Sequence, residues 1–414
     1  MFKCEEGINT EYLTLPNMKR ISPDTRIDRT DPSLKKLRKA VHAQLLKVGF
    51  EKTSEGYSID GNVSKQRIRK MHLMQRKHVL KQNRLLIDEA GSELIRHFAS
   101  GNQVDPNRID PELIEVRANS LESELFRFTC LLWSVPVSRG FGRRLRFLVR
   151  DRQNGCLIGI FALGDPVFNL SARDQWIGWN HKDRLERLSH VMDAYIVGAV
   201  PPYAQLIGGK LIAGLIGSDE VSAIYDRKYF GKISIIGNKR NKKHLVLVTT
   251  SSALGRSSLY NRLRIPKGPQ FIRIGTTRGF GHFHFSGDIF QLLRERLEKN
   301  GHPYARGNRF GMGPNWKLRV VRVALESIGL DGNMLLKHGI NREVYAMPLA
   351  QNYRDILLGR RKRSLGCTLP AGNISEFCKQ RWMIPRSIRD GRYKEFERNR
   401  LLESLRQEEP GPLW

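Results

Sequence analysis

Three side chains in the middle of the chain have types and spacing suited to phosphodiester chemistry: Tyr260, His282 and His284. The two histidines are two residues apart in the segment GHFHFSGD. On a β-strand their imidazoles would lie on one face and could share a divalent metal ion. The alternative is a pair of histidines in a half-buried strand. Three carboxylates are candidates for a third metal ligand: Asp165, Asp193 and Asp288.

Tyr260 follows the apolar segment HLVLVTT, and open α/β folds often present reacting groups just beyond the end of a strand. Its hydroxyl could attack a phosphodiester as a nucleophile or donate its proton as a general acid. A tyrosine buried in the core is the alternative. A histidine pair with a separate tyrosine resembles the site of HUH single-strand endonucleases. That resemblance implies metal-dependent cutting or transfer of single-stranded DNA by Tyr260, His282, His284 and Asp165.

A glycine pair stands in the segment VPPYAQLIGGKLIAGLIGS, where we predict a helix over 203–217. Gly208 and Gly209 would each cost about 0.5–1 kcal/mol relative to alanine, so either close packing or a ligand requires the bare backbone. With Gln205 and Lys210 they would form a helix start that accepts a phosphate. The Q-x-x-G spacing resembles the pyrophosphate motif of the GNAT acyltransferase fold. That resemblance implies an acyl-CoA-like cofactor and Tyr260 as its proton donor.

The charge of the chain points to a polyanionic partner. Lys and Arg number 71 against 41 Asp and Glu, a formal net charge of +30, which favours nucleic acid, with DNA expected over RNA. No basic amphipathic segment carries an aromatic apolar face, so a membrane surface is not expected. The candidate phosphate contacts are arginines in glycine-rich or loop segments: Arg139, Arg143, Arg144 and Arg256.

The elements that must position these residues predict a mixed α/β fold. LRFLVRD and CLIGIFALG are strand-like, and Asn154-Gly155 between them is a hairpin turn signal. Further strands are predicted at HVMDAYIVGAV, KISII, HLVLVTT, FIRIGTT and GHFHF, with helices at 203–217, 219–230, 256–264 and 287–299. We expect a loose tail (1–30), a basic helical domain (31–132), a GNAT-like α/β domain with an antiparallel or mixed sheet (133–300), and a basic helical region (301–414).

Several segments together resemble one family. SRGFGRRLRFLVRD, GIFALGDPVFNLSARDQWIGW, DAYIVGAVPPYAQLIGGKLIAGLIGSDEV, ALGRSSLYNRL and GTTRGFGHFHF are similar to the DruA family of the Druantia anti-phage defence systems. The resemblance covers most of the chain. It implies a role in bacterial defence beside a large helicase-like partner, and it implies no particular reaction. A non-catalytic DNA-binding adaptor therefore stands beside the two catalytic schemes.

The remaining composition constrains the setting of the protein. The five cysteines are scattered and include no CxxC pair, which argues against a disulfide framework or a structural zinc site. No apolar run approaches the length of a membrane span, and the N-terminus has no secretory pattern. These features predict a location in a reducing cytoplasm.

Overall fold

A computed structural model describes residues 31–53, 56–59, 63–138, 140, 142–233, 240–305 and 316–407. The predicted tail (1–30), Arg139 and part of the strand predicted at KISII lie outside the described residues. No helix among the described residues is long and apolar enough to cross a membrane.

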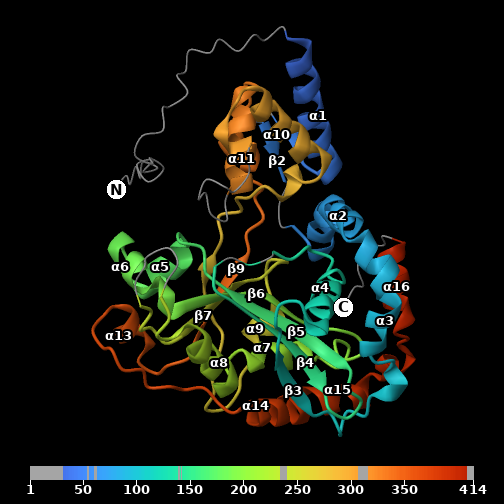
Figure 1. Ribbon diagram of the computed structural model, residues 1–414, viewed down its shortest axis with the longest axis vertical. Helices are drawn as coiled ribbons and strands as arrows, with labels where there is room; N and C mark the ends of the chain where they lie inside the picture. Colours follow the sequence, from blue (N-terminus) through green and yellow to red (C-terminus); the bar gives the residue numbers. More distant parts are fainter. Residues whose placement is uncertain are drawn as a thin grey trace.

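A seven-stranded sheet forms the centre of the protein (Figure 1). Its strand order is β3-β4-β5-β6-β7-β9-β8, and only β6 and β7 pair in parallel. The strands are β3 (Pro111–Glu115), β4 (Arg144–Asp151), β5 (Leu157–Gly164), β6 (Val191–Ala199), β7 (Leu247–Ser251), β8 (Ile272–Thr276) and β9 (Glu343–Pro348). The prediction of a mixed α/β fold is confirmed.

The predicted hairpin forms β4 and β5. Gly155 has φ +71°, a left-handed conformation that glycine adopts without strain, and the Asp151 N–H donates to the Cys156 carbonyl across the turn. Every residue of β5 is buried, because helices cover both faces of the sheet at this strand.

Helices pack on both faces of the sheet. One apolar cluster joins the sheet to α7 (Gly209–Leu215), α8 (Asp219–Tyr229) and α14 (Ala371–Cys378). A second joins the opposite face to α4 (Leu121–Cys130) and α16 (Asn399–Arg406). A third covers β7 and β9 with α5 (Ser171–Ile177) and α13 (Tyr353–Leu357). Further helical segments around the sheet are η2 (Leu86–Ala90), α3 (Gly91–Leu94), η3 (Ile95–His97), η4 (Gly101–Gln103), α6 (His181–Arg187), η5 (Leu188–His190), α9 (Ser258–Asn261), η9 (Lys379–Met383), α15 (Ile384–Arg389) and η10 (Gly391–Glu395).

A helical layer lies beyond one end of the sheet, at the top of Figure 1. It combines α1 (Pro32–Val48) and α2 (Lys65–Gln82) with α10 (Asp288–Lys299), α11 (Trp316–Ser327) and α12 (Gly332–Leu336) in one apolar cluster. A short hairpin, β1 (Glu51–Thr53) and β2 (Gly56–Ser58), belongs to the same layer. Asp31 and Ser64 cap α1 and α2 through their side chains.

Three predicted elements differ from the structure. GHFHF is a 3₁₀ turn, η6 (Phe283–Phe285), and not a strand. The adjacent residues His284 and Phe285 are both buried, although successive side chains of a strand point to opposite faces, and Gly279 and Gly287 turn the chain on either side. The helix predicted over 203–217 begins only at Gly209, and the one predicted over 256–264 is limited to α9.

Candidate nucleic-acid interface

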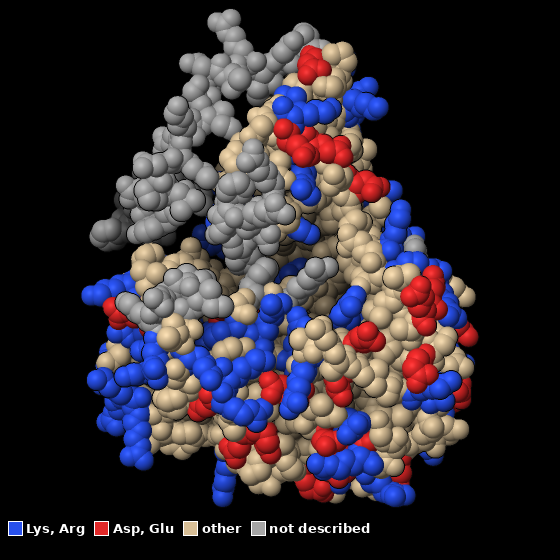
Figure 2. Space-filling view, viewed as in Figure 1, with Lys and Arg blue, Asp and Glu red and all other residues tan. Residues whose placement is uncertain are grey.

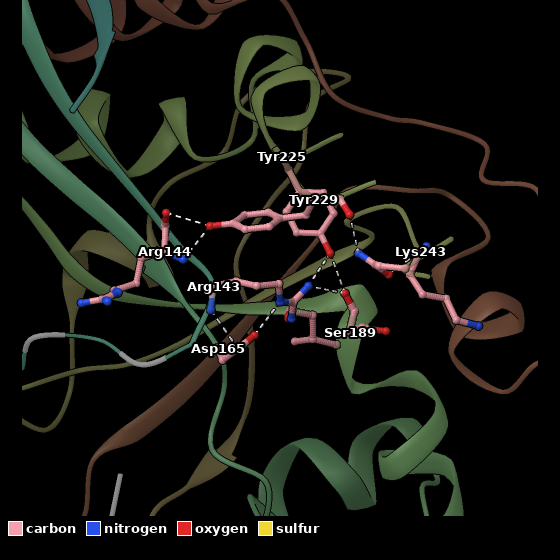
Figure 3. Close-up of polar contacts among 9 residues, drawn as sticks. Arg143, Arg144, Asp165, Ser189, Tyr225, Tyr229 and Lys243 are labelled. Carbon is pink, nitrogen blue, oxygen red and sulfur yellow. Dashed lines mark hydrogen bonds and ion pairs between the residues drawn. The ribbon is translucent and has the colours of Figure 1, made fainter. Parts of the chain in front are cut away.

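Arg143, predicted to contact phosphate, is an internal anchor (Figure 3). Its Nε donates to Asp165 Oδ1 at 2.6 Å, Nη2 donates to the Val191 carbonyl at 3.0 Å, and Nη1 donates to the Ser189 carbonyl and the Tyr225 hydroxyl. Only 17% of the side chain is exposed. The guanidinium thus ties the start of β4 to the end of β5, the entry to β6, and α8.

The glycines beside Arg143 serve this internal contact. Gly142 has φ +56°, and a Cβ added there would lie 1.9 Å from Asp165 Oδ2. The same carboxylate accepts a hydrogen bond from the Arg143 backbone N–H at 3.0 Å. The glycine-rich turn thus holds Arg143 against Asp165, and contact of Arg143 with phosphate stays a prediction.

Arg144 and Arg256 are exposed, as a phosphate contact requires. The Tyr229 hydroxyl accepts from the Arg144 N–H at 2.7 Å and donates to the Arg144 carbonyl at 2.9 Å. This pairing fixes the backbone, and the side chain extends away from the network (Figure 3). Arg256 lies in the connection between β7 and α9.

Exposed cations gather around α6, around the chain between α8 and β7, and after α13. Figure 2 shows Lys and Arg concentrated on the side where Figure 1 draws α5, α6, α8 and α13. We call the following set the basic surface: Arg144, Lys182, Lys232, Arg240, Lys242, Arg360, Arg361, Lys362 and Arg363. Within the described residues, only Arg360 and Arg361 of this set have an acidic partner, Asp355, at 3.9 Å.

Two contacts join the segments that carry the basic surface. The ring Nδ1 of His190, which follows α6, is 2.9 Å from the His244 carbonyl, which follows Lys242. A Cβ added at Gly359, just before the run Arg360–Arg363, would lie 2.5 Å from Arg187 of α6. The α8–β7 connection and the start of the run Arg360–Arg363 are therefore both close to α6.

Partly exposed aromatic rings lie among these cations. Phe230 is 40% exposed and stacks on His244 with ring centroids 4.5 Å apart. Phe168 is 36% exposed and lies 5.3 Å below the Arg184 guanidinium. Cations interleaved with aromatic faces can bind both phosphates and bases.

Close packing accounts for Gly208 of the glycine pair, whereas a Cβ at Gly209 would meet only Leu259, at an ordinary 3.6 Å. A Cβ at Gly208 would lie 2.7 Å from the Tyr203 carbonyl oxygen. The Lys210 ammonium donates to the Arg262 carbonyl at 2.8 Å and lies 4.4 Å from the Trp382 ring centre. The Gln205 carbonyl accepts from Arg386 Nε at 3.3 Å. The structure therefore gives the close-packing alternative a direct physical basis.

Tyr260 is buried in the core beneath the sheet. It is 7% exposed, and its ring packs against Phe271 and Tyr345 at centroid distances of 4.8 and 5.0 Å. Burial raises the pKa of its hydroxyl to about 12 despite a hydrogen bond with the Thr250 side chain. A hydroxyl with this pKa is a poor nucleophile at neutral pH.

Asp193 lies on β6 near this region. Burial raises the pKa of its carboxyl to about 6, while the Thr249 hydroxyl donates to it at 2.9 Å and favours its charged form. Asp288 is at the start of α10 in the helical layer. The three candidate third ligands, Asp165, Asp193 and Asp288, thus occupy different elements.

The histidine pair lies apart from Tyr260. His284 is 1% exposed in the helical layer, and its Nε2 is 2.8 Å from the Leu335 carbonyl. Burial lowers the pKa of both His282 and His284 to about 4. No three His, Cys, Asp or Glu side chains of the described chain are grouped to hold a metal ion. The predicted strand face for a metal is absent because η6 replaces the strand.

The cations of the α8–β7 connection were missed by the sequence reasoning. The run KRNKK at 239–243 was the signal that could have revealed them. The run GRRKRS at 359–364 is also plain in the sequence, but only the fold shows that the chain at His244, just after the first run, and Gly359 lie close to α6 and the turn that follows it.

Comparison with known proteins identifies relatives over most of the chain. Residues 62–359 match the family described as Druantia protein DruA. The chain is 44% identical over 361 residues to a Druantia protein DruA from Escherichia coli (strain UMEA 4076-1), covering 87% of this chain and 89% of the relative. No solved structure matches the chain, and a relation to the GNAT fold stays a prediction.

Proposed function

The chain belongs to the DruA family, and from this premise we propose that it is the component of a Druantia anti-phage system that binds nucleic acid. The basic surface is the proposed contact, with DNA as the preferred ligand. In this proposal the chain holds the nucleic acid for a helicase-like partner of the same system and catalyses no reaction itself.

The observation that carries the proposal is the basic surface, in which only Arg360 and Arg361 have an acidic partner among the described residues. Six or more of them could each neutralise a phosphate and release a counterion, which is the main source of nucleic-acid affinity. Exposed cations near one another repel, and this repulsion destabilises the compact fold. Without a polyanionic ligand, nothing offsets that cost. The chain as a whole is also cationic, with a formal net charge of +30, which favours the same polyanionic ligand.

Burial argues against the catalytic alternatives. A nucleophile or general acid must reach its substrate, and Tyr260 is enclosed by Phe271 and Tyr345. His284 belongs to a different apolar cluster from Tyr260. At the start of α7, Tyr203 lies against Gly208 and Leu259 lies near Gly209. We therefore do not propose an acyl-CoA site there.

Charge reversal tests the proposed contact. Lys242→Glu with Arg363→Glu should weaken DNA binding roughly 50-fold at 0.1 M salt, since each lost phosphate contact removes about a factor of eight. Lys36→Glu with Lys39→Glu is the matched control, because both lysines are exposed on α1 and the charge change is equal. Equal losses in the two pairs would show that only net charge matters and would exclude the basic surface as the contact. Phage protection should fall only in the first pair.

A further inference from the structure

A continuous helical rod lies at the bottom of Figure 1, and its side chains border an open hollow. The rod runs through α14, the π-helical turn η9 and α15. Pro385 follows η9 and has no N–H for a regular α-helical ladder, which accounts for a wider turn before it. The hollow is lined by Arg381, Trp382, Pro385, Ile388 and Arg389.

Cations converge beside this hollow. The pKa of the Lys210 ammonium is lowered first by burial and further by the charges of Arg262, Arg381 and Arg264. All three arginines are exposed, and none forms an ion pair with a carboxylate in the described part of the chain. Four like charges near one another favour an anion among them.

The apolar part of the hollow is unusually open. Ile388 is 80% exposed, the largest exposed fraction among the large hydrophobic residues of the described chain. Trp382 is partly exposed and is fixed by an edge contact with Phe377, at 5.4 Å between ring centres, and by the Lys210 ammonium. A rigid indole next to cations is a platform on which a nucleic-acid base can stack.

We propose that this hollow binds single-stranded nucleic acid, with a base stacked on Trp382 and the flanking phosphates held by Arg381 and Arg389. The hollow is lined by two arginines and no carboxylate, so its charge complements a phosphate backbone. A base in a duplex is already stacked and paired, and only an unpaired base presents its face to an indole. The site therefore distinguishes single strands from duplexes.

This inference rests on the proposed function and adds a second contact on other elements. The basic surface is carried by β4, α6, the α8–β7 connection and the segment after α13. The hollow is carried by η9 and α15. A nucleic acid with duplex and single-stranded parts could contact both, as expected where a helicase-like partner opens a duplex.

The test uses the full chain with a fluorescent 15-nucleotide single strand and with the duplex of the same sequence. Trp382→Leu should weaken single-strand binding about 5- to 150-fold, the range for one lost base–aromatic stack. Trp382→Phe should recover part of the affinity. Because Trp382 packs against the core, Arg381→Glu provides a second variant on an exposed side chain, and it should weaken single-strand binding about eightfold or more at 0.1 M salt.

Photo-crosslinking locates the base directly. A single strand carrying 5-bromodeoxyuridine should crosslink to the tryptic peptide 382–386, whose N-terminal residue is Trp382. The RNA of the same sequence is the competitor that separates a DNA-specific from a general single-strand site. Effects confined to the single strand, with duplex affinity unchanged, support the hollow.

Two results would overturn the inference. One is unchanged single-strand affinity in folded Trp382→Leu and Arg381→Glu variants, with affinity still lost on reversal of Lys242 and Arg363. This leaves nucleic-acid binding intact and removes the second site. The other is a parent chain that binds neither single strand nor duplex, in which case the proposed function fails as well.

Discussion

Replacing Arg143 and its neighbour Arg144 with glutamine should separate a structural arginine from a binding arginine. Arg143 makes four side-chain hydrogen bonds, and Arg143→Gln leaves Asp165 and two carbonyls without the guanidinium. Removing one partner of a fully buried ion pair costs about 3–5 kcal/mol; the Asp165 side chain is 37% exposed, and solvent screening reduces the cost here to about 2–3 kcal/mol. We therefore expect Arg143→Gln to lower the free energy of unfolding by that amount.

Arg144→Gln should have the opposite profile. The exposed Arg144 side chain forms no ion pair with any residue that the structure describes, and its backbone contacts with Tyr229 do not depend on the side chain. Its free energy of unfolding should change by less than about 0.5 kcal/mol, while DNA affinity should fall about eightfold at 0.1 M salt. Urea unfolding and fluorescence anisotropy measure the two quantities. An Arg143→Gln protein of parental stability that has lost DNA binding would refute the assignment of Arg143 as an internal anchor.

Three further predictions concern Tyr260, the glycine pair and the buried histidines. Tyr260→Phe should cost about 1 kcal/mol of stability and keep phage protection in a plaque assay; lost protection by a stable, DNA-binding variant would restore a catalytic role. Gly208→Ala should lower the melting temperature, because the new Cβ would lie 2.7 Å from the Tyr203 carbonyl oxygen. In Gly209→Ala the new Cβ meets only Leu259, at 3.6 Å, and the melting temperature should not fall. Equal effects of the two variants would contradict the packing explanation. Burial holds the pKa of His72 and His284 near 4 in the folded protein against about 6.5 when unfolded, so the unfolded chain binds more protons between these values. The stability that these histidines contribute is complete above pH 6.5 and is lost as the pH falls towards 4, by up to about 1.4 kcal/mol per pH unit for each histidine. Urea unfolding at pH 7, 5.5 and 4.5 should show this loss. An unfolding midpoint that does not change with pH would contradict burial of neutral histidines.

Local signals predicted much of the fold. Asn154-Gly155 predicted the β4–β5 hairpin, and Asp31 and Ser64, residue types that favour N-caps, stand at the starts of α1 and α2. These features depend on residues close in the sequence, where turn and cap chemistry decide the backbone. The short apolar segment GHFHF was ambiguous by the same standard, because its burial depends on packing against helices of the distant helical layer.

The candidate site was harder to predict because its contacts are long-range. Arg143 pairs with the Asp165 carboxylate, the Ser189 and Val191 carbonyls and the Tyr225 hydroxyl. Nothing in the segment SRGFGRR indicates these partners. The glycine at 208 looked like a ligand site because the approach of the Tyr203 carbonyl is visible only in the folded backbone. The excess of positive charge is plain in the sequence, and the fold shows which of the described cations are exposed.

The salt dependence of DNA binding tests the central claim most directly. The affinity of the parent chain for a duplex should be measured between 50 and 200 mM salt, together with Lys242→Glu/Arg363→Glu. If the basic surface contacts six or more phosphates, log K should fall with log salt with a slope of about −5 or steeper, and the slope should become shallower by about 2 in the double variant. Binding that is absent at 50 mM salt, or a slope that the double variant leaves unchanged, would contradict the account.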